Sequence, residues 1–510
     1  MAFEPVYNVI KTDSKRRLAA AQTVAECRLM PEAGIKIKKV LSISCAGNIN
    51  TLEMLAGEAR FSGRVSFKVL FSDDEGNLHC IAGGEGFSDK AVAAEITAGM
   101  SGEAECCVTD SDTASVLDGE IRLTCVLDVQ LFADAGERIT HLKEGGGDLF
   151  TQKETLEYCA LSGKSEETFS ISDERSSKEK PVRVLMCESQ AVIKNAYAGI
   201  DCITAEGTAV TTVLIETAGK NVGSLVFNTD FSQEIQARGA SAGNDVTALV
   251  AVKDASARLL GDGEEGNTVR TEIDLTVRAS AFSQETAELV TDAFCVTNEV
   301  NMATESFKVS RFMFSKCFNE RIEGSAPLDA DMPFIDNICA VCGGRMNIAV
   351  AAAETDRVRI EGLINTGVIY FNREADSVSS VQVELPFSIA LSAPGVKEGS
   401  VVMAKGIVTD IGARPRKGTE IDIGASVCIS IQVFESRDGL CVKEIEIGAE
   451  RDLKMSAIAV YITKAGESLW DVAKALCTTP ELILSYNPGL KVPLSGNERI
   501  LVYRQHTAKI

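Results

Sequence analysis

The chain has 510 residues, 45% hydrophobic and 24% charged, which predicts three or four folded domains and not a disordered protein. Its formal net charge of −22 argues against binding to a nucleic-acid backbone. The first residues lack a basic segment followed by an apolar one, and no apolar run approaches the roughly 20 residues that cross a bilayer, so we expect a cytosolic chain without membrane insertion.

One sequence pattern occurs three times along most of the chain. It consists of a glycine, a Phe-Ser pair and a Val-x-Asp triplet. The glycines are Gly63, Gly207 and Gly362, the phenylalanines Phe87, Phe231 and Phe387, and the aspartates Asp110, Asp254 and Asp410. The glycine and phenylalanine are 24, 24 and 25 residues apart, and the phenylalanine and valine are 21 apart in every copy. Such constant spacings predict three copies of one domain.

Within each copy, apolar and polar residues alternate, as in half-buried β-strands. Val65, Phe67, Val69 and Phe71 show this alternation in the first copy, and a longer run from 421 to 433 shows it in the third. Turns rich in Gly, Asp and Asn separate the runs. The sequence therefore predicts a mainly-β chain with three tandem antiparallel β-sandwich-like repeats, at residues 1–145, 148–297 and 303–452.

The C-terminal segment predicts a small α+β unit in the order strand, helix, helix, strand. Ser468 and Asp471 form a capping-box pattern at the start of an apolar stripe. Thr479 followed by proline predicts the start of a second helix, and Asn487 followed by proline predicts its end. Alternating apolar residues at 458–462 and 500–502 predict the flanking strands.

Few residues are arranged for catalysis. His79, His141 and His506 are expected in a turn, a linker and the chain end, without a nucleophile beside them. Cys339 and Cys342 have the spacing of half a zinc site, but a second pair is missing and strand geometry should place them on opposite faces, which favours buried thiols. The three repeat aspartates could bind calcium, but turn aspartates bonded to their own backbone are a simpler interpretation. We expect no enzyme activity, cofactor or metal.

The C-terminal segment, residues 456–505, resembles a LysM module. The resemblance depends on the Gly-Glu-Ser-Leu-Trp turn into the first helix, the Asn-Pro pair after the second, and a final glycine before Ile-Leu-Val-Tyr. Asp and Thr are more usual in the family where this chain has Glu467 and Ser468. The resemblance implies a groove for N-acetylglucosamine chains or for a protein, with Trp470 either on the ligand-facing surface or in the core. The implied groove residues are Ala465, Gly466, Glu467, Ser468, Leu469, Trp470, Asn487, Pro488, Gly489 and Leu490.

Three repeats followed by one such module resemble the SPOCS-domain spore coat morphogenetic proteins of the SipL type from spore-forming Firmicutes. The resemblance implies a non-enzymatic scaffold that is made in the mother-cell cytoplasm and gathers at the forespore surface, in the spore coat. It would dock through the LysM module on a SpoIVA-like coat ATPase and contact other coat proteins. The alternatives are an envelope protein that binds peptidoglycan in the same groove, and a wall hydrolase, for which no catalytic cluster is evident.

Overall fold

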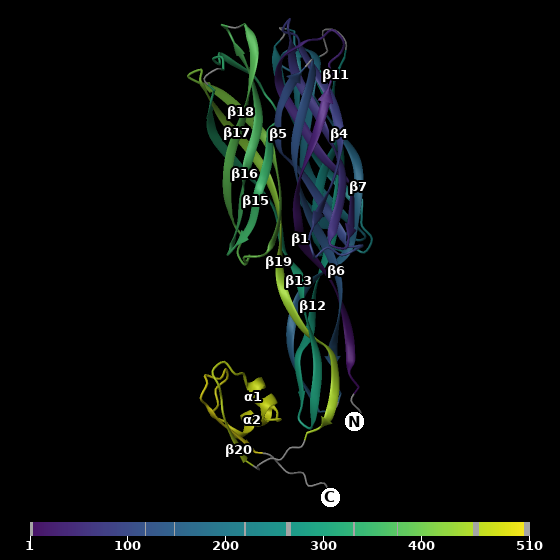
Figure 1. Ribbon diagram of the computed structural model, residues 1–510, viewed down its shortest axis with the longest axis vertical. Coiled ribbons are helices and arrows are strands. Elements are labelled where there is room, and N and C mark those ends of the chain that lie inside the picture. The colour runs from purple at the N-terminus through teal and green to yellow at the C-terminus, as the bar shows by residue number, and fades with distance from the viewer. Residues whose placement is uncertain are drawn as a thin grey trace.

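The computed structural model describes residues 4–117, 119–146, 148–218, 221–261, 267–329, 332–374, 376–451 and 458–503 (Figure 1). Its regular elements are mainly β-strands, which confirms the predicted mainly-β class. The predicted domain end at 452, the outermost residues of the C-terminal segment (456–457 and 504–505) and His506 lie outside the described residues. Among the residues described, no helix is both long and apolar enough to pass through a membrane.

Strands β1 to β19 form three consecutive groups, which we call units 1, 2 and 3. Unit 1 contains β1 (Val6–Leu29), β2 (Ile37–Leu55), β3 (Glu58–Asp73), β4 (Leu78–Val92), β5 (Ser101–Leu117) and β6 (Glu120–Glu144). Unit 2 contains β7 (Leu149–Ser176), β8 (Pro181–Ala198), β9 (Cys202–Thr217), β10 (Val222–Gln236), β11 (Asp245–Leu260) and β12 (Thr268–Cys295). Unit 3 contains β13 (Asn298–Pro327), β14 (Asn337–Val341), β15 (Arg345–Glu354), β16 (Arg357–Asn372), β17 (Ser377–Ser392), β18 (Val401–Arg416) and β19 (Glu420–Glu450).

All three units share one antiparallel strand order. Unit 1 has sheets β1-β6-β5 and β2-β3-β4, and unit 2 repeats them as β7-β12-β11 and β8-β9-β10. Unit 3 has β13-β19-β18 and a second sheet in which β14, β15 and β17 all pair with β16. The two sheets of each unit contribute to one apolar core, as in a β-sandwich. Unit 3 starts before the predicted boundary at 303, because residues 298–302 already pair with β19.

The repeated glycines and phenylalanines face each other across neighbouring strands. The pairs are Gly63 with Phe87, Gly207 with Phe231 and Gly362 with Phe387. A side-chain carbon added to these glycines would lie 2.5, 2.5 and 2.9 Å from the phenylalanine Cζ, and closer still to a backbone carbonyl oxygen. The missing side chain thus leaves the space that each ring fills, which explains why the two residues keep their spacing.

The repeated Val-x-Asp triplet marks a β-bulge in β5, β11 and β18. In each strand the register shifts between the valine and the aspartate, so the middle residue has no partner opposite. These middle residues are Thr109, Lys253 and Thr409. The expectation that the aspartates lie in turns was wrong. They lie inside strands, because the extra residue of a bulge bends and twists a strand without ending it.

The three units pack around a common centre. Leu70, Leu214 and Ile369 occupy the same place in their units, seven residues after the repeat glycine. They come from β3, β9 and β16, lie in one cluster, and are at most 1% exposed. Burying aliphatic side chains of this size contributes roughly 1.5–3 kcal/mol each. The units therefore form one body with threefold-like internal repetition, and the chain is not a string of separate domains.

Below the sandwiches, the longest strands continue as two-stranded ribbons, β1–β6, β7–β12 and β13–β19 (Figure 1). Leu142, Val290 and Val442, one from each ribbon, meet in a buried cluster, so the ribbons form a shared stalk. His141 is only 2% exposed in β6, and its predicted place in a linker was wrong. Strand β6 continues through the expected linker because its apolar residues pack against the other two ribbons.

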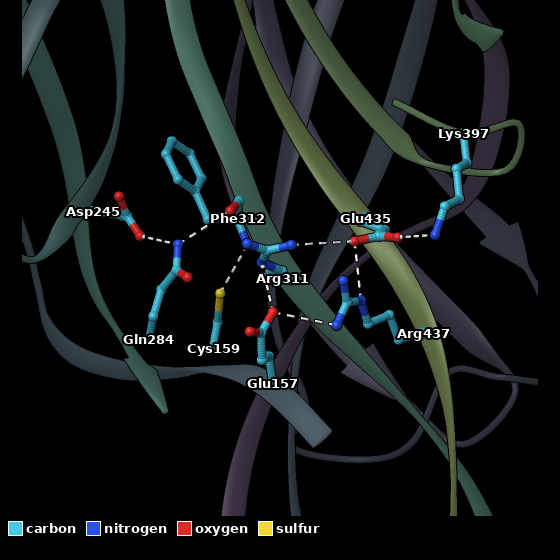
Figure 2. A network of polar contacts seen from close by, with 9 residues as sticks. All are labelled: Glu157, Cys159, Asp245, Gln284, Arg311, Phe312, Lys397, Glu435 and Arg437. Atoms are coloured by element: carbon cyan, nitrogen blue, oxygen red, sulfur yellow. Dashed lines mark hydrogen bonds and ion pairs between the residues drawn. The ribbon is translucent and has the colours of Figure 1, made fainter. Parts of the chain in front are cut away.

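A network of charged side chains joins units 2 and 3 where the stalk meets the sandwiches (Figure 2). Glu435, whose side chain is 4% exposed, accepts hydrogen bonds from Lys397 (2.7 Å) and from Nε of Arg437 (3.0 Å). Arg311 and Arg437 both pair with Glu157 of unit 2, at 3.2 and 3.3 Å. Burial alone would raise the pKa of Glu435, but the hydrogen bonds and charges of Lys397 and Arg437 outweigh it and lower this pKa. Unit 2 thereby contributes to neutralising two arginines of unit 3.

Candidate functional site

The C-terminal module is the part of the chain to which the sequence assigns binding residues. It contains β20 (Ile458–Ile462), α1 (Leu469–Ala475), α2 (Pro480–Tyr486) and β21 (Arg499–Tyr503), in the predicted order. The predicted capping box is confirmed: Asp471 N donates to the Ser468 hydroxyl (3.1 Å), and Ser468 N donates to the Asp471 carboxylate (2.9 Å). The Ser468 hydrogen bonds lower the pKa of Asp471. Thr479 caps α2 as predicted, accepting from Leu482 N.

One side of the predicted groove is the turn that contains Ala465, Gly466, Glu467 and Ser468. Gly466 has a φ of +83°, a conformation that favours glycine. Glu467 accepts hydrogen bonds from the Tyr461 hydroxyl (2.6 Å) and from Lys464 N (2.8 Å). The bond from the Lys464 backbone, followed by that from Tyr461, lowers the pKa of Glu467. The carboxylate of Glu467 is therefore used to hold the turn against β20.

The other side of the predicted groove is the segment from Asn487 to Leu490. The Asn487 amide donates to the carbonyl oxygens of Ile483 and Leu501, both at 2.8 Å, and accepts from Leu501 N at 2.9 Å. Asn487 thus joins the end of α2 to β21. Pro488 and Gly489 are exposed, whereas Leu490 packs against the apolar core of the module.

Trp470 points towards the stalk. Its indole Nε1 donates to Asp292 of β12 at 2.7 Å, and its ring packs edge-on against Phe294 with centroids 4.9 Å apart. Lys474, one turn later on α1, donates to both oxygens of the Asp292 carboxylate, at 2.7 and 2.9 Å. Figure 1 places α1 and α2 beside the lower end of the ribbons. Of the two interpretations left open for Trp470, the structure favours packing, with the stalk as well as the module as its partner.

An exposed apolar surface lies on the strands of the module. Ile458, Val460 and Ile462 of β20 are 55–62% exposed, and Tyr503, opposite Ile458 on β21, is 45% exposed. We call these four residues the β20 face. Sequence periodicity indicated the alternation in β20. The pattern does not indicate which side of β20 packs against the helices, because Tyr461 and its neighbours are all apolar or aromatic.

The cysteines mostly behave as small apolar groups, as predicted for Cys45 and Cys125, which are buried in unit 1. Cys339 and Cys342 both pack against the central cluster of the three units. The expectation that they face opposite sides was wrong, because the register of β14 shifts at Cys339. Burial raises the pKa of Cys342 to about 12. Within the described ranges, no three His, Cys, Asp or Glu side chains gather as metal ligands would.

Comparison with known proteins links one unit to a family. Residues 335–415 match the family described as SipL, SPOCS domain. They run from the segment before β14 to the end of β18 and so include the repeat marks of unit 3. No curated protein and no solved structure matches the chain. The matched family is a non-catalytic, protein-interaction type of domain associated with sporulation and the spore coat. Residues 335–415 of unit 3 are therefore similar to the SPOCS domain of the SipL family.

Proposed function

We propose that this protein is a non-enzymatic scaffold of spore coat assembly that gathers at the forespore surface from the mother-cell cytoplasm. The observation that carries the proposal is the SPOCS domain at residues 335–415. Units 1 and 2 have the strand order of unit 3, which supports treating them as two further domains of this type. An arrangement of three packed units offers a rigid body on which other coat proteins can assemble.

The C-terminal module is the proposed contact with a basement-layer coat protein, a SpoIVA-like ATPase. The β20 face supports a protein partner, since exposed aliphatic and aromatic side chains grouped on one surface are typical of protein interfaces. The predicted groove offers less to a sugar. The side chains of Glu467 and Asn487 already form hydrogen bonds inside the module, and Trp470 is engaged by the stalk.

The test compares the full-length chain with a variant of the β20 face in binding to the purified ATPase. Val460→Glu places a charge in the middle of the face, and we expect at least a tenfold loss of affinity. Val92→Glu is the matched control, because Val92 is 70% exposed on unit 1, outside the module. Equal affinity of all three proteins would refute docking through this face. Sedimentation with purified peptidoglycan, lost in a variant of the groove turn such as Gly466→Val, would instead favour the sugar-binding alternative.

A further inference from the structure

A cavity of about 350 Å³ lies between units 1 and 2 and is also lined by Arg345 of unit 3. Four cationic side chains line it: Arg64 and Lys68 of β3, Lys253 of β11 and Arg345 of β15. Arg64 and Lys253 are exposed, whereas Lys68 and Arg345 are half-buried, so the cavity can be reached from the surface. Such a concentration of cations is unexpected in a chain with a net charge of −22.

Among the residues that the structure describes, the four cations have no carboxylate partner at ion-pair distance. Across the described part of the chain, none of them forms an ion pair, and their hydrogen bonds go to neutral oxygens. Lys68 donates to the Cys187 carbonyl at 2.8 Å, and Arg345 to the Ser44 hydroxyl at 2.8 Å. The Lys253 side chain has no hydrogen bond within this same described part. Two carboxylates, Glu188 and Asp254, also line the cavity, which leaves an excess of two positive charges.

Comparison among the units shows that the fold does not require these charges. The residues equivalent to Arg64, one after the repeat glycine, are Thr208 and Leu363. Those equivalent to Lys68 are Thr212 and Gly367, and those equivalent to Lys253, at the bulge, are Thr109 and Thr409. The hydroxyls of both bulge threonines donate a hydrogen bond to a carbonyl oxygen of the neighbouring strand, at 3.3 and 3.0 Å. The same backbone positions are thus compatible with neutral side chains.

At the other two junctions between units, neutral or apolar residues take the corresponding places. Between units 3 and 1, the corresponding cavity is about 50 Å³, contains Asn365 and Gly367 in place of Ser66 and Lys68, and shares Arg345 with the larger cavity. Between units 2 and 3, an apolar cluster that includes Val210 and Ile407 fills the junction. The large basic cavity is therefore a specialisation of one junction in an otherwise repeated arrangement.

We propose that the cavity between units 1 and 2 binds a small oxyanion of the phosphate or carboxylate type with at least two negative charges. Arginine and lysine are the side chains that recognise such groups, and guanidinium hydrogen bonds to them are directional and charge-assisted. Two excess positive charges match a dianion, and the volume accommodates a ligand larger than a phosphate ion. The inference is independent of the proposed role in coat assembly.

The test is calorimetric titration of the full chain with pyrophosphate and, separately, with citrate, with sodium chloride added to keep the ionic strength constant. The variant Arg64→Thr/Lys253→Thr carries residues that equivalent positions already hold, so we expect it to fold. Its affinity should be at least about tenfold lower, because two charge-assisted contacts are lost. Arg60→Thr, which removes an exposed cation from the same strand, is the control and should bind like the wild type.

The two probes distinguish the ligand type. Binding of pyrophosphate alone would assign the site to phosphate groups, binding of citrate alone to carboxylates, and binding of both to oxyanions in general. The proposal is overturned if neither probe binds the wild type, or if the double variant binds as tightly as the wild type. A circular dichroism spectrum and melting temperature close to those of the wild type would establish that the double variant is folded.

Discussion

Asp292 is the main polar partner of the module on the stalk, and we predict that Asp292→Ala weakens the docking of the module. Asp292 accepts three hydrogen bonds from α1, one from Trp470 and two from Lys474. Its side chain is 22% exposed and that of Lys474 is 38% exposed, so water partly screens the ion pair. The contact with Phe294 remains in the variant and keeps part of the docking free energy.

The expected loss of docking free energy in Asp292→Ala can be estimated from these contacts. A hydrogen bond to a charged group contributes about 1.5–3 kcal/mol to stability, and a partly exposed ion pair adds about 0.2–1 kcal/mol. We therefore expect Asp292→Ala to weaken docking by about 2 kcal/mol or more, which corresponds to about thirtyfold in the equilibrium constant. Asp292→Asn should have a smaller effect, because an amide oxygen can still accept from Trp470 although the charge opposite Lys474 is lost.

Tryptophan fluorescence reports docking directly, because Trp470 is the only tryptophan of the chain. In Asp292→Ala we expect emission at longer wavelength and stronger quenching by acrylamide, with an unchanged melting transition of the three units. Asp274→Ala, on the same strand and hydrogen-bonded to Ser170, is the control and should leave the emission unchanged. Emission and quenching like those of the wild type in Asp292→Ala would show that the contact does not hold the module.

Three further predictions concern stability, measured by urea denaturation. Glu435→Ala removes a buried carboxylate that accepts two charged hydrogen bonds, while Arg311 and Arg437, 33% and 30% exposed, keep Glu157 as a partner, so it should lower the free energy of unfolding by about 2 kcal/mol. Because folding lowers the pKa of Glu435, this contribution is present above about pH 4.3 and is lost as the pH falls through the folded pKa; a difference that persists in acid would contradict the assignment. His141→Leu should stabilise the fold by about 1 kcal/mol, because it removes a buried Nε2 atom that has no hydrogen-bond partner among the described residues. Leucine fits this position, since the equivalent stalk residue of unit 2 is Leu289. A lower urea midpoint would contradict this prediction. Gly207→Ala should destabilise by about 1–3 kcal/mol, since the added carbon would meet the Phe231 ring, whereas Gly412→Ala, with open space around it, should not.

Several features of this protein could be derived from the sequence because they depend on neighbours along the chain. Alternation of apolar and polar residues indicates strands, since successive side chains point to opposite faces. The Ser468 and Asp471 capping box is confirmed because its hydrogen bonds form within four residues. The spacing between Gly207 and Phe231 revealed the repeat, although its physical reason, a ring that fills the space above a glycine, became clear only from strand pairing.

Other features depend on contacts between residues far apart in the sequence, and only the tertiary structure decided them. No local pattern distinguishes Leu142 in a stalk from an apolar residue at the edge of a linker, because its partners, Val290 and Val442, lie about 150 and 300 residues away. The direction of Trp470 follows in the same way from Asp292 of unit 2. The sequence determined which strands and helices form. Packing between the units determined what those elements bury and which charged groups they bring together, because burial is a property of the whole assembly.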